Sequence, residues 1–241
     1  MDLIRPLWTD VDRKPFLDYL KTFEQTIKID WARKILNTNL PLLAMPTKKM
    51  DDIVKEIRLG NSISFLDLCI DDYYETIAIQ GKLICKISDF DVMKHYLDRY
   101  ATVMENWAHV DLLSFDIQSD NQTKFLKLSD EYSQSKKPFI RRLSLMILFQ
   151  MVKDKKVLEV IFQALRALSL ETDYYVIMMA GWLLSECIIL YKDETLSFIN
   201  NPELNPKVIN KGIQKCRESR RLTQIQKDAL LPYKRKKNHE V

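Results

Sequence analysis

The segment VLEVIFQALRAL, residues 157–168, decides the fold class of this chain. Its apolar residues form one continuous stripe at helical spacing: Val157, Leu158, Ile161, Phe162, Leu165 and Leu168. The same spacing recurs along nearly the whole chain, and no stretch alternates as a half-buried strand would. The pattern therefore predicts an all-α protein.

The composition supports helices and excludes nucleotide-driven chemistry. A chain of 241 residues that is 46% hydrophobic is long enough to bury one substantial core. It holds only 4 Gly and 8 Pro, which leaves little material for tight hairpins. No G-x-G-x-x-G or G-x-x-x-x-G-K motif occurs, so a glycine-rich phosphate loop is not expected.

Capping residues and prolines divide the chain into helices. Starts are predicted at Thr47 before residues 48–57, at Asp89 before residues 92–100, and at Asp173 before Tyr174. Breaks are predicted at Pro41 and Pro46, at Pro138, and across residues 200–206. Residues 139–152 and 174–191 are more uniformly apolar, so we expect these two helices to lie deeper.

The helices form pairs of about 35–45 residues, a length typical of HEAT-type repeats. Asp72-Tyr73-Tyr74 before Gly81 is echoed by Asp173-Tyr174-Tyr175 before Gly181. We therefore predict an α-solenoid over residues 1–231, followed by a basic C-terminal tail at 232–241. Stacked pairs would curve, and the inner helices would line a concave groove suited to a long, stiff ligand.

Other features predict a cytoplasmic protein without cofactors. Residues 174–191 hold a single charge, Glu186, but an inner helix of a layered α protein explains them better than a membrane span. The N-terminus has no export signal, and four widely spaced cysteines predict free thiols in a reducing compartment. His95, His109 and His239 lack metal-ligand spacing, so we expect no metal.

Positive charge is concentrated at the C-terminal end. Residues 201–241 carry 11 Lys and Arg against 4 Asp and Glu, whereas the whole chain has a net charge of +4. A solvated tail accounts for Lys234 to Lys237. It accounts less well for the residues predicted to be helical, which indicate contact with a polyanion: Lys211, Lys215, Arg217, Arg220 and Arg221.

Five further residues at three places in the sequence are ambiguous from their residue types alone. Trp107 and Asp111 are four residues apart, so on a helix they share one face and could receive a cationic group. A core tryptophan beside a surface aspartate would give the same pattern. Arg141 and Arg142 open an apolar helix, where each must reach a phosphate or a neighbouring carboxylate. Trp182 lies among apolar residues and by itself looks like core.

Taken in order, these motifs resemble the AlkD-like DNA alkylation repair family. The series runs Asn106-Trp107-x-x-x-Asp111, Phe139-Ile140-Arg141-Arg142, residues 174–185 around Gly181-Trp182, and residues 210–219. Residues 32–37 and 44–49 fall where that family has its first helical repeat, so the resemblance spans about residues 30–231. It implies a HEAT-like solenoid that binds duplex DNA in a concave basic groove, where members hydrolyse the N-glycosidic bond of cationic alkylpurines.

The resemblance also implies roles for individual residues. Trp107 and Trp182 correspond to the tryptophans that pack against the damaged nucleotide, and Asp111 corresponds to the essential carboxylate. Arg142 corresponds to an arginine near the lesion backbone. The remaining DNA contacts that we predict are Arg141, Lys34, Lys211, Lys215, Arg217 and Arg220. The partner would be duplex DNA containing alkylated bases, bound by a monomer without membrane, metal or cofactor.

One departure from the family leaves alternatives open. Lys34 stands where several members have an aromatic residue near the DNA. The leading hypothesis is an alkylpurine DNA glycosylase, and the alternative is a non-catalytic repeat protein that binds distorted or branched DNA. A solenoid scaffold for another protein is a third class, and it would need an exposed apolar groove rather than a basic one.

Overall fold

A computed structural model describes residues 1–235, and these residues form α-helices and short 3-10 helices joined by loops, without a strand. The predicted all-α class is confirmed for this part of the chain. The structure comprises two compact units, residues 1–116 and residues 117 onward, each described by itself below. The single domain over residues 1–231 stays a prediction. Of the predicted tail at 232–241, residues 236–241, with Lys236, Lys237 and His239, lie outside the described residues.

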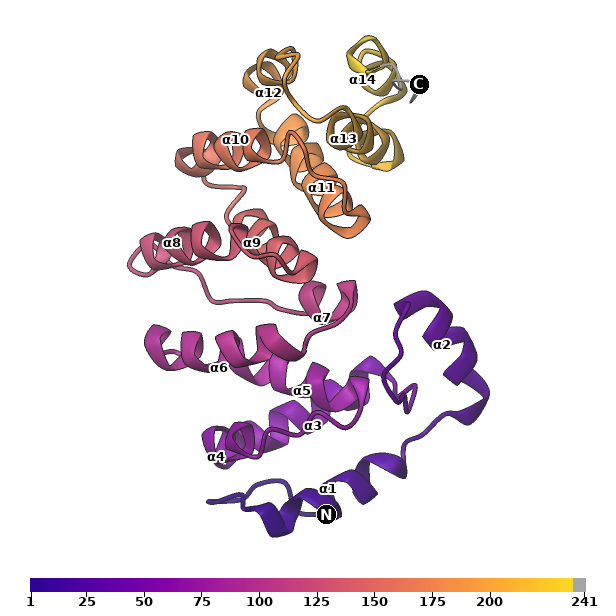
Figure 1. Cartoon of the computed structure of the whole chain (residues 1–241), viewed down its shortest axis with the longest axis vertical. Coiled ribbons are helices and arrows are strands. Elements are labelled where there is room, and N and C mark those ends of the chain that lie inside the picture. Colours follow the sequence, from indigo (N-terminus) through magenta and orange to yellow (C-terminus); the bar gives the residue numbers. More distant parts are fainter. Residues whose placement is uncertain (236–241) are drawn as a thin grey trace. The chain divides into compact units, whose positions relative to one another are not determined.

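The first unit contains seven α-helices and one 3-10 helix within residues 1–116 (Figure 1). They are α1 (Asp10–Lys21), η1 (Thr26–Lys28), α2 (Ile29–Leu36), α3 (Thr47–Leu59), α4 (Ser62–Asp67), α5 (Tyr74–Ile84), α6 (Phe90–Val103) and α7 (Trp107–Asp111). Helix α5 is the centre of this unit, because it packs against α3, α6 and α7. Nearly all of its residues are buried, whereas α2 buries none.

The second unit contains the remaining helices (Figure 1). They are α8 (Gln122–Ser133), α9 (Pro138–Gln150), η2 (Lys155–Val157), α10 (Leu158–Ala167), α11 (Tyr174–Leu190), α12 (Lys192–Ile199), α13 (Pro206–Glu218), α14 (Gln224–Asp228) and η3 (Leu231–Tyr233). Within this unit α9 packs on α11 and α11 packs on α13, while α8 covers α9 and α12 contacts α11. The two segments expected to lie deeper correspond to α9 and α11, which bury seven of 13 and ten of 17 residues. Helix α5 of the first unit, which the apolar pattern did not single out, buries nine of 11.

Local capping explains most helix boundaries. The predicted caps at Asp89 and Asp173 are confirmed: each carboxylate accepts hydrogen bonds from the backbone N–H groups two and three residues further on. The cap predicted at Thr47 is wrong by one residue, because Pro46 is the capping residue and Thr47 is the first residue of α3. Proline at Pro46 and Pro138 suits a helix start, where its missing N–H is not needed.

Helix α11 is the most apolar helix of the described residues, and it is an inner helix of the second unit. Its 17 residues are buried along most of its surface between α9 and α13. Among the described residues, no helix combines the length and apolar character needed to cross a bilayer.

Candidate nucleic-acid interface

The structure places Trp107 and Asp111 at the first and last positions of α7. Asn106 begins this helix, because its side-chain oxygen accepts hydrogen bonds from the N–H groups of Ala108 (2.9 Å) and His109 (3.2 Å). Both Trp107 and Asp111 are half-buried. Since they are one helical turn apart, an indole and a carboxylate project from one face of a short, capped helix.

His109 fixes the position of α7 against the centre of the first unit. Its ring is fully buried and stacks on Tyr74, with centroids 4.6 Å apart. Nε2 donates to the Tyr74 carbonyl over 3.2 Å, and Nδ1 accepts from the Glu105 N–H over 3.4 Å. This pairing requires a neutral ring, and burial lowers the pKa of His109 to about 4.

Two hydrogen bonds connect the start of α7 to the end of α2. The indole Nε1 of Trp107 donates to the carbonyl of Ile35 over 3.2 Å. The Thr38 hydroxyl donates to the Glu105 carboxylate just before α7. Trp107 is therefore oriented by a backbone group of α2, and a displacement of α2 would be transmitted to the indole.

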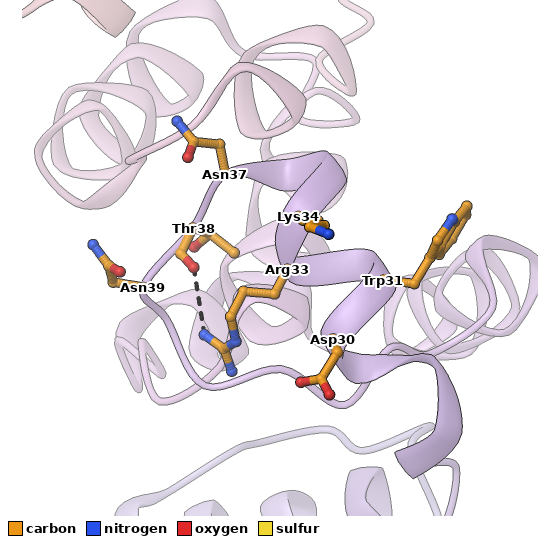
Figure 2. Close-up of a pocket in the computed structure, with 7 residues that line it drawn as sticks. All are labelled: Asp30, Trp31, Arg33, Lys34, Asn37, Thr38 and Asn39. Carbon is orange, nitrogen blue, oxygen red and sulfur yellow. Dashed lines mark hydrogen bonds between the residues drawn. The ribbon is translucent and has the colours of Figure 1, made fainter.

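Helix α2 carries the predicted DNA contact Lys34, which is exposed. Lys34 lines a hollow of about 620 Å³ formed by one face of α2 and the loop that follows it. Figure 2 shows that Trp31 extends outward from α2, whereas Arg33 turns towards the loop. The Arg33 guanidinium donates to the carbonyls of Leu40 (3.1 Å) and Thr38 (3.4 Å), so its charge helps to hold the loop.

A buried carboxylate at the start of α5 holds the next part of this loop. Glu75 is 1% exposed, and its oxygens accept hydrogen bonds from the N–H groups of Leu43 (3.1 Å) and Met45 (3.2 Å). Ala44 lies between these two residues with φ 50°, a left-handed conformation that is unfavourable for alanine. Burial raises the pKa of Glu75, and the backbone donors oppose that shift.

Glu75→Gln should destabilise the protein by about 1–3 kcal/mol, because an amide NH₂ would replace one of the oxygens that face backbone donors. The measurement is the free energy of unfolding in urea. Glu24 is exposed in the same unit, so Glu24→Gln provides the matched control and should change stability by about 0.5 kcal/mol or less. Equal stabilities of the two variants would contradict a structural role for Glu75.

The two arginines at the start of α9 have different partners. Arg141 forms a paired contact with Glu171 (2.8 and 3.2 Å) and also donates to the carbonyls of Ser135 and Lys136. Arg142 is 5% exposed and donates from NH1 to the carbonyl of Tyr175 over 2.6 Å. Arg141 therefore has a carboxylate as its partner, which is one of the two alternatives that the sequence allowed. Arg142 stabilises the first turn of α11.

Trp182 lies on the outward stripe of α11, with Tyr175, Met178 and Glu186 at helical spacing. It is 37% exposed, so it is not the ordinary core residue that its neighbours suggested. Phe149 of α9 contacts one side of the indole, with ring centroids 4.6 Å apart and planes inclined by 50°. An anchored, partly exposed indole is suited to packing against a ligand.

The predicted basic residues of the last repeat lie on and after α13. Lys211 is half-buried beside α11, and Lys215 pairs with Glu218 over 3.0 Å. Arg217 is exposed on α13. Arg220 and Arg221 were predicted to be helical and are not, because α13 ends at Glu218. Arg220 is exposed, while Arg221 pairs with Glu186 of α11.

Gly181 allows α13 to approach α11 closely beside Trp182. A Cβ at this position would lie 2.5 Å from Cγ and 2.7 Å from Cβ of Lys211. The stem of Lys211 therefore occupies the space that a side chain at residue 181 would need. The aliphatic part of Lys211 therefore lies beside Gly181, the residue that precedes Trp182. The Lys211 ammonium donates to the side-chain oxygen of Gln214 over 2.9 Å.

Gly181→Ala should therefore destabilise the second unit even though alanine favours helices. The helical preference contributes about 1 kcal/mol, whereas forcing atoms into a packed contact costs about 1–3 kcal/mol. We expect a net loss of about 1 kcal/mol, measured by thermal or urea unfolding. A stability equal to or above that of the native protein would show that the two helices separate without cost.

Three residues that shape this region are not predicted by the sequence. The sequence predicts neither the anchoring role of His109 nor that of Glu75, and in the segment around Trp31 it indicates only Lys34 as a DNA contact. For Trp31 a signal existed, since Ile27, Trp31 and Ile35 repeat every four residues. His109 and Glu75 bind backbone groups distant in sequence, which leave no local pattern.

Among residues 1–235, no group of three or more His, Cys, Asp or Glu side chains is arranged to hold a metal ion. The four cysteines are free thiols, of which Cys69 is half-buried and the others are buried. Burial raises the pKa of Cys85, Cys187 and Cys216 to about 12, so these thiols are poor nucleophiles near neutral pH.

These features define an all-helical protein whose two units each present a tryptophan with charged residues nearby. The model of the DNA alkylation repair enzyme family matches residues 18–221. The chain therefore belongs to the DNA alkylation repair enzyme family, and the resemblance noted from its motifs is confirmed. No curated protein matches the sequence closely enough to be reported as a relative.

Proposed function

We propose that this protein is a DNA glycosylase that hydrolyses the N-glycosidic bond of N3- and N7-alkylated purines in duplex DNA. Family membership supports a role in DNA alkylation repair. The observation that carries the more specific activity is the pairing of Trp107 and Asp111 on one face of α7, a helix anchored by the buried His109. A fixed carboxylate can stabilise the positive charge that develops on the sugar, and an indole beside it can bind the positively charged base.

The chemistry requires little from the protein beyond placement of charge. An alkylated purine is positively charged and leaves readily, so the sugar develops oxocarbenium character as the bond breaks. Asp111 would stabilise that positive charge and orient the attacking water. The indole face of Trp107 would hold the cationic nucleotide through cation–π contact. No cofactor or metal takes part in this scheme.

The second unit would bind the DNA around the lesion. Trp182, supported by Phe149, would provide a second indole for the damaged nucleotide. Arg142 is 5% exposed and donates to the carbonyl of Tyr175, so its proposed contact with the DNA backbone would require the guanidinium to turn away from that carbonyl. Arg141 would lie close to the same part of the backbone. Lysines and arginines on and after α13 would follow the phosphates, which gives binding a strong dependence on salt: Lys211, Lys215, Arg217 and Arg220. We propose that these residues contribute to a concave basic groove of a HEAT-like solenoid.

The direct test is a base-release assay. Methylated duplex DNA is incubated with the native protein, and free methyladenine and methylguanine are separated from the DNA and quantified. Release above that of a reaction without protein would support the proposal. Release at the background level, with DNA binding intact, would contradict the enzymatic claim.

The alternative is a DNA-binding protein without glycosylase activity. Lys34 favours it, because an exposed lysine occupies a position where several family members carry an aromatic residue. This alternative predicts salt-sensitive DNA binding that is unchanged by Asp111→Asn and is weakened by Arg142→Ala. Because Arg142 also holds the carbonyl of Tyr175, the stability of its variant must be measured in parallel.

A further inference from the structure

Helix α2 carries an exposed apolar stripe that no helix of its own unit covers. Ile27 of η1 is 99% exposed, Trp31 is 66% exposed and Ile35 is 46% exposed, and these residues are spaced by four. Trp31 is more exposed than Trp182, at 37%, or the half-buried Trp107. Exposure of a large indole is unfavourable in water, so a stripe of this kind marks a contact surface.

The charge around the stripe indicates the class of partner. Residues 26–36, which form η1 and α2, contain three Lys and Arg and one acidic residue, Asp30, so these two elements have a net charge of +2. Lys28 and Lys34 are both exposed and lie three residues before and after Trp31. Figure 2 shows Trp31 extending outward from α2, and Trp31 and Lys34 line one hollow together with residues 37–39. An indole between two ammonium groups complements a nucleic-acid strand, in which bases alternate with phosphates.

The indole also distinguishes between kinds of DNA. In an intact duplex the faces of the bases are covered by their neighbours, so an exposed indole can reach only their edges. A base that has lost its partner can turn out of the stack and place its face against the indole. We propose that the outer face of α2 binds an unpaired base of DNA by stacking on Trp31, with Lys28 and Lys34 contacting the flanking phosphates.

This proposal rests on the DNA-binding part of the proposed function, and it assigns a separate site to α2. The site is connected to α7, since the Trp107 indole donates to the carbonyl of Ile35 at the end of α2. Binding of DNA to Trp31 would therefore act on α2, the helix whose backbone orients Trp107. The preferred substrates would be damaged duplexes that contain a bulged or mispaired base near the lesion.

The test compares three labelled DNAs of the same sequence: an intact duplex, a duplex with one bulged base, and a single strand. Affinities are measured by fluorescence anisotropy at one salt concentration. Trp31→Ala should weaken binding to the bulged duplex and the single strand about 10-fold, and should leave intact-duplex affinity within about twofold. Trp31→Phe should retain most of the affinity, and Lys34→Gln should reduce the salt dependence with all three DNAs.

The matched control is Leu59→Ala, which removes an apolar side chain of equal exposure (67%) from α3 of the same unit. It should not change any of the three affinities. The inference is overturned if Trp31→Ala binds bulged DNA as tightly as the native protein, or if it loses affinity equally for all three DNAs. If the native protein binds none of the three DNAs, the proposed function fails as well. Base release from an intact methylated duplex without any preference for the bulge would leave the proposed function standing and contradict only the α2 site.

Discussion

Asp111→Asn is expected to reduce the release of methylated purines from duplex DNA by at least about 100-fold. The substitution keeps the size and position of the side chain but removes its negative charge. A positively charged sugar would then form without its fixed counter-charge, and loss of one preorganised electrostatic contact commonly costs a factor of about 100 to 1,000 in rate. The measurement is single-turnover base release with enzyme in excess, which reports the chemical step.

DNA affinity separates this effect from simple loss of binding. Asp111→Asn should bind methylated duplex at least as tightly as the native protein, because a negative charge facing phosphates is removed. Asp52 is exposed on α3 of the same unit, and Asp52→Asn serves as the control that should release bases at the native rate. A native rate of release by Asp111→Asn would exclude Asp111 as the catalytic carboxylate.

The stability of the protein is expected to fall by about 3 kcal/mol between pH 6.5 and pH 4 because of His109. Burial lowers the pKa of this residue from 6.5 to about 4, so the unfolded chain takes up a proton in this range and the folded chain does not. The stabilising contribution is complete above pH 6.5 and is lost progressively as the pH falls towards 4. Protonation of the folded form would set an Nδ1–H against the N–H of Glu105.

The prediction is tested by urea unfolding of the native protein and of His109→Gln across this range. The variant should lose the pH-dependent component, although it will be less stable near neutrality because the stacking on Tyr74 is lost. Burial raises the pKa of Glu75, so its contribution to the pH dependence has the opposite sign, but Glu75 is present in both proteins and cancels in the difference. His95 is exposed, so His95→Gln should follow the native curve. A curve of His109→Gln parallel to the native one would contradict the buried neutral histidine.

At the proposed site, protonation of His109 should affect both the stability of the protein and the release of bases. In the sequence of α7, His109 lies midway between Trp107 and Asp111, and its ring is buried against Tyr74. When His109 is protonated, Nδ1 can no longer accept from the Glu105 N–H, while Nε2 still donates to the Tyr74 carbonyl. Base release should therefore decline in acid together with the local order of α7. The fluorescence of Trp107, taken as the difference between the native protein and Trp107→Phe, would follow this change.

Much of the architecture could be predicted from the sequence because helix formation depends on near neighbours. The stripe at residues 157–168 appears as α10, preceded by the short η2, and the caps at Asp89 and Asp173 act where predicted. The placement of Trp107 and Asp111 on one helical face follows from the same local rule. Thr47 was misplaced by one residue because a proline can begin a helix in place of a hydroxyl cap.

The sequence by itself determined the all-helical fold, the order of its motifs and the family to which the chain belongs. Only the tertiary structure decided which side chains remain available to a ligand. Trp182 lies in an apolar run and is nevertheless 37% exposed, because α9 and α13 cover the other faces of α11. Arg142 is buried against the carbonyl of Tyr175, and Trp31 is exposed on a helix that buries none of its residues. Each of these outcomes depends on segments distant in sequence, and helical periodicity shows which residues share a face but not whether another helix covers it.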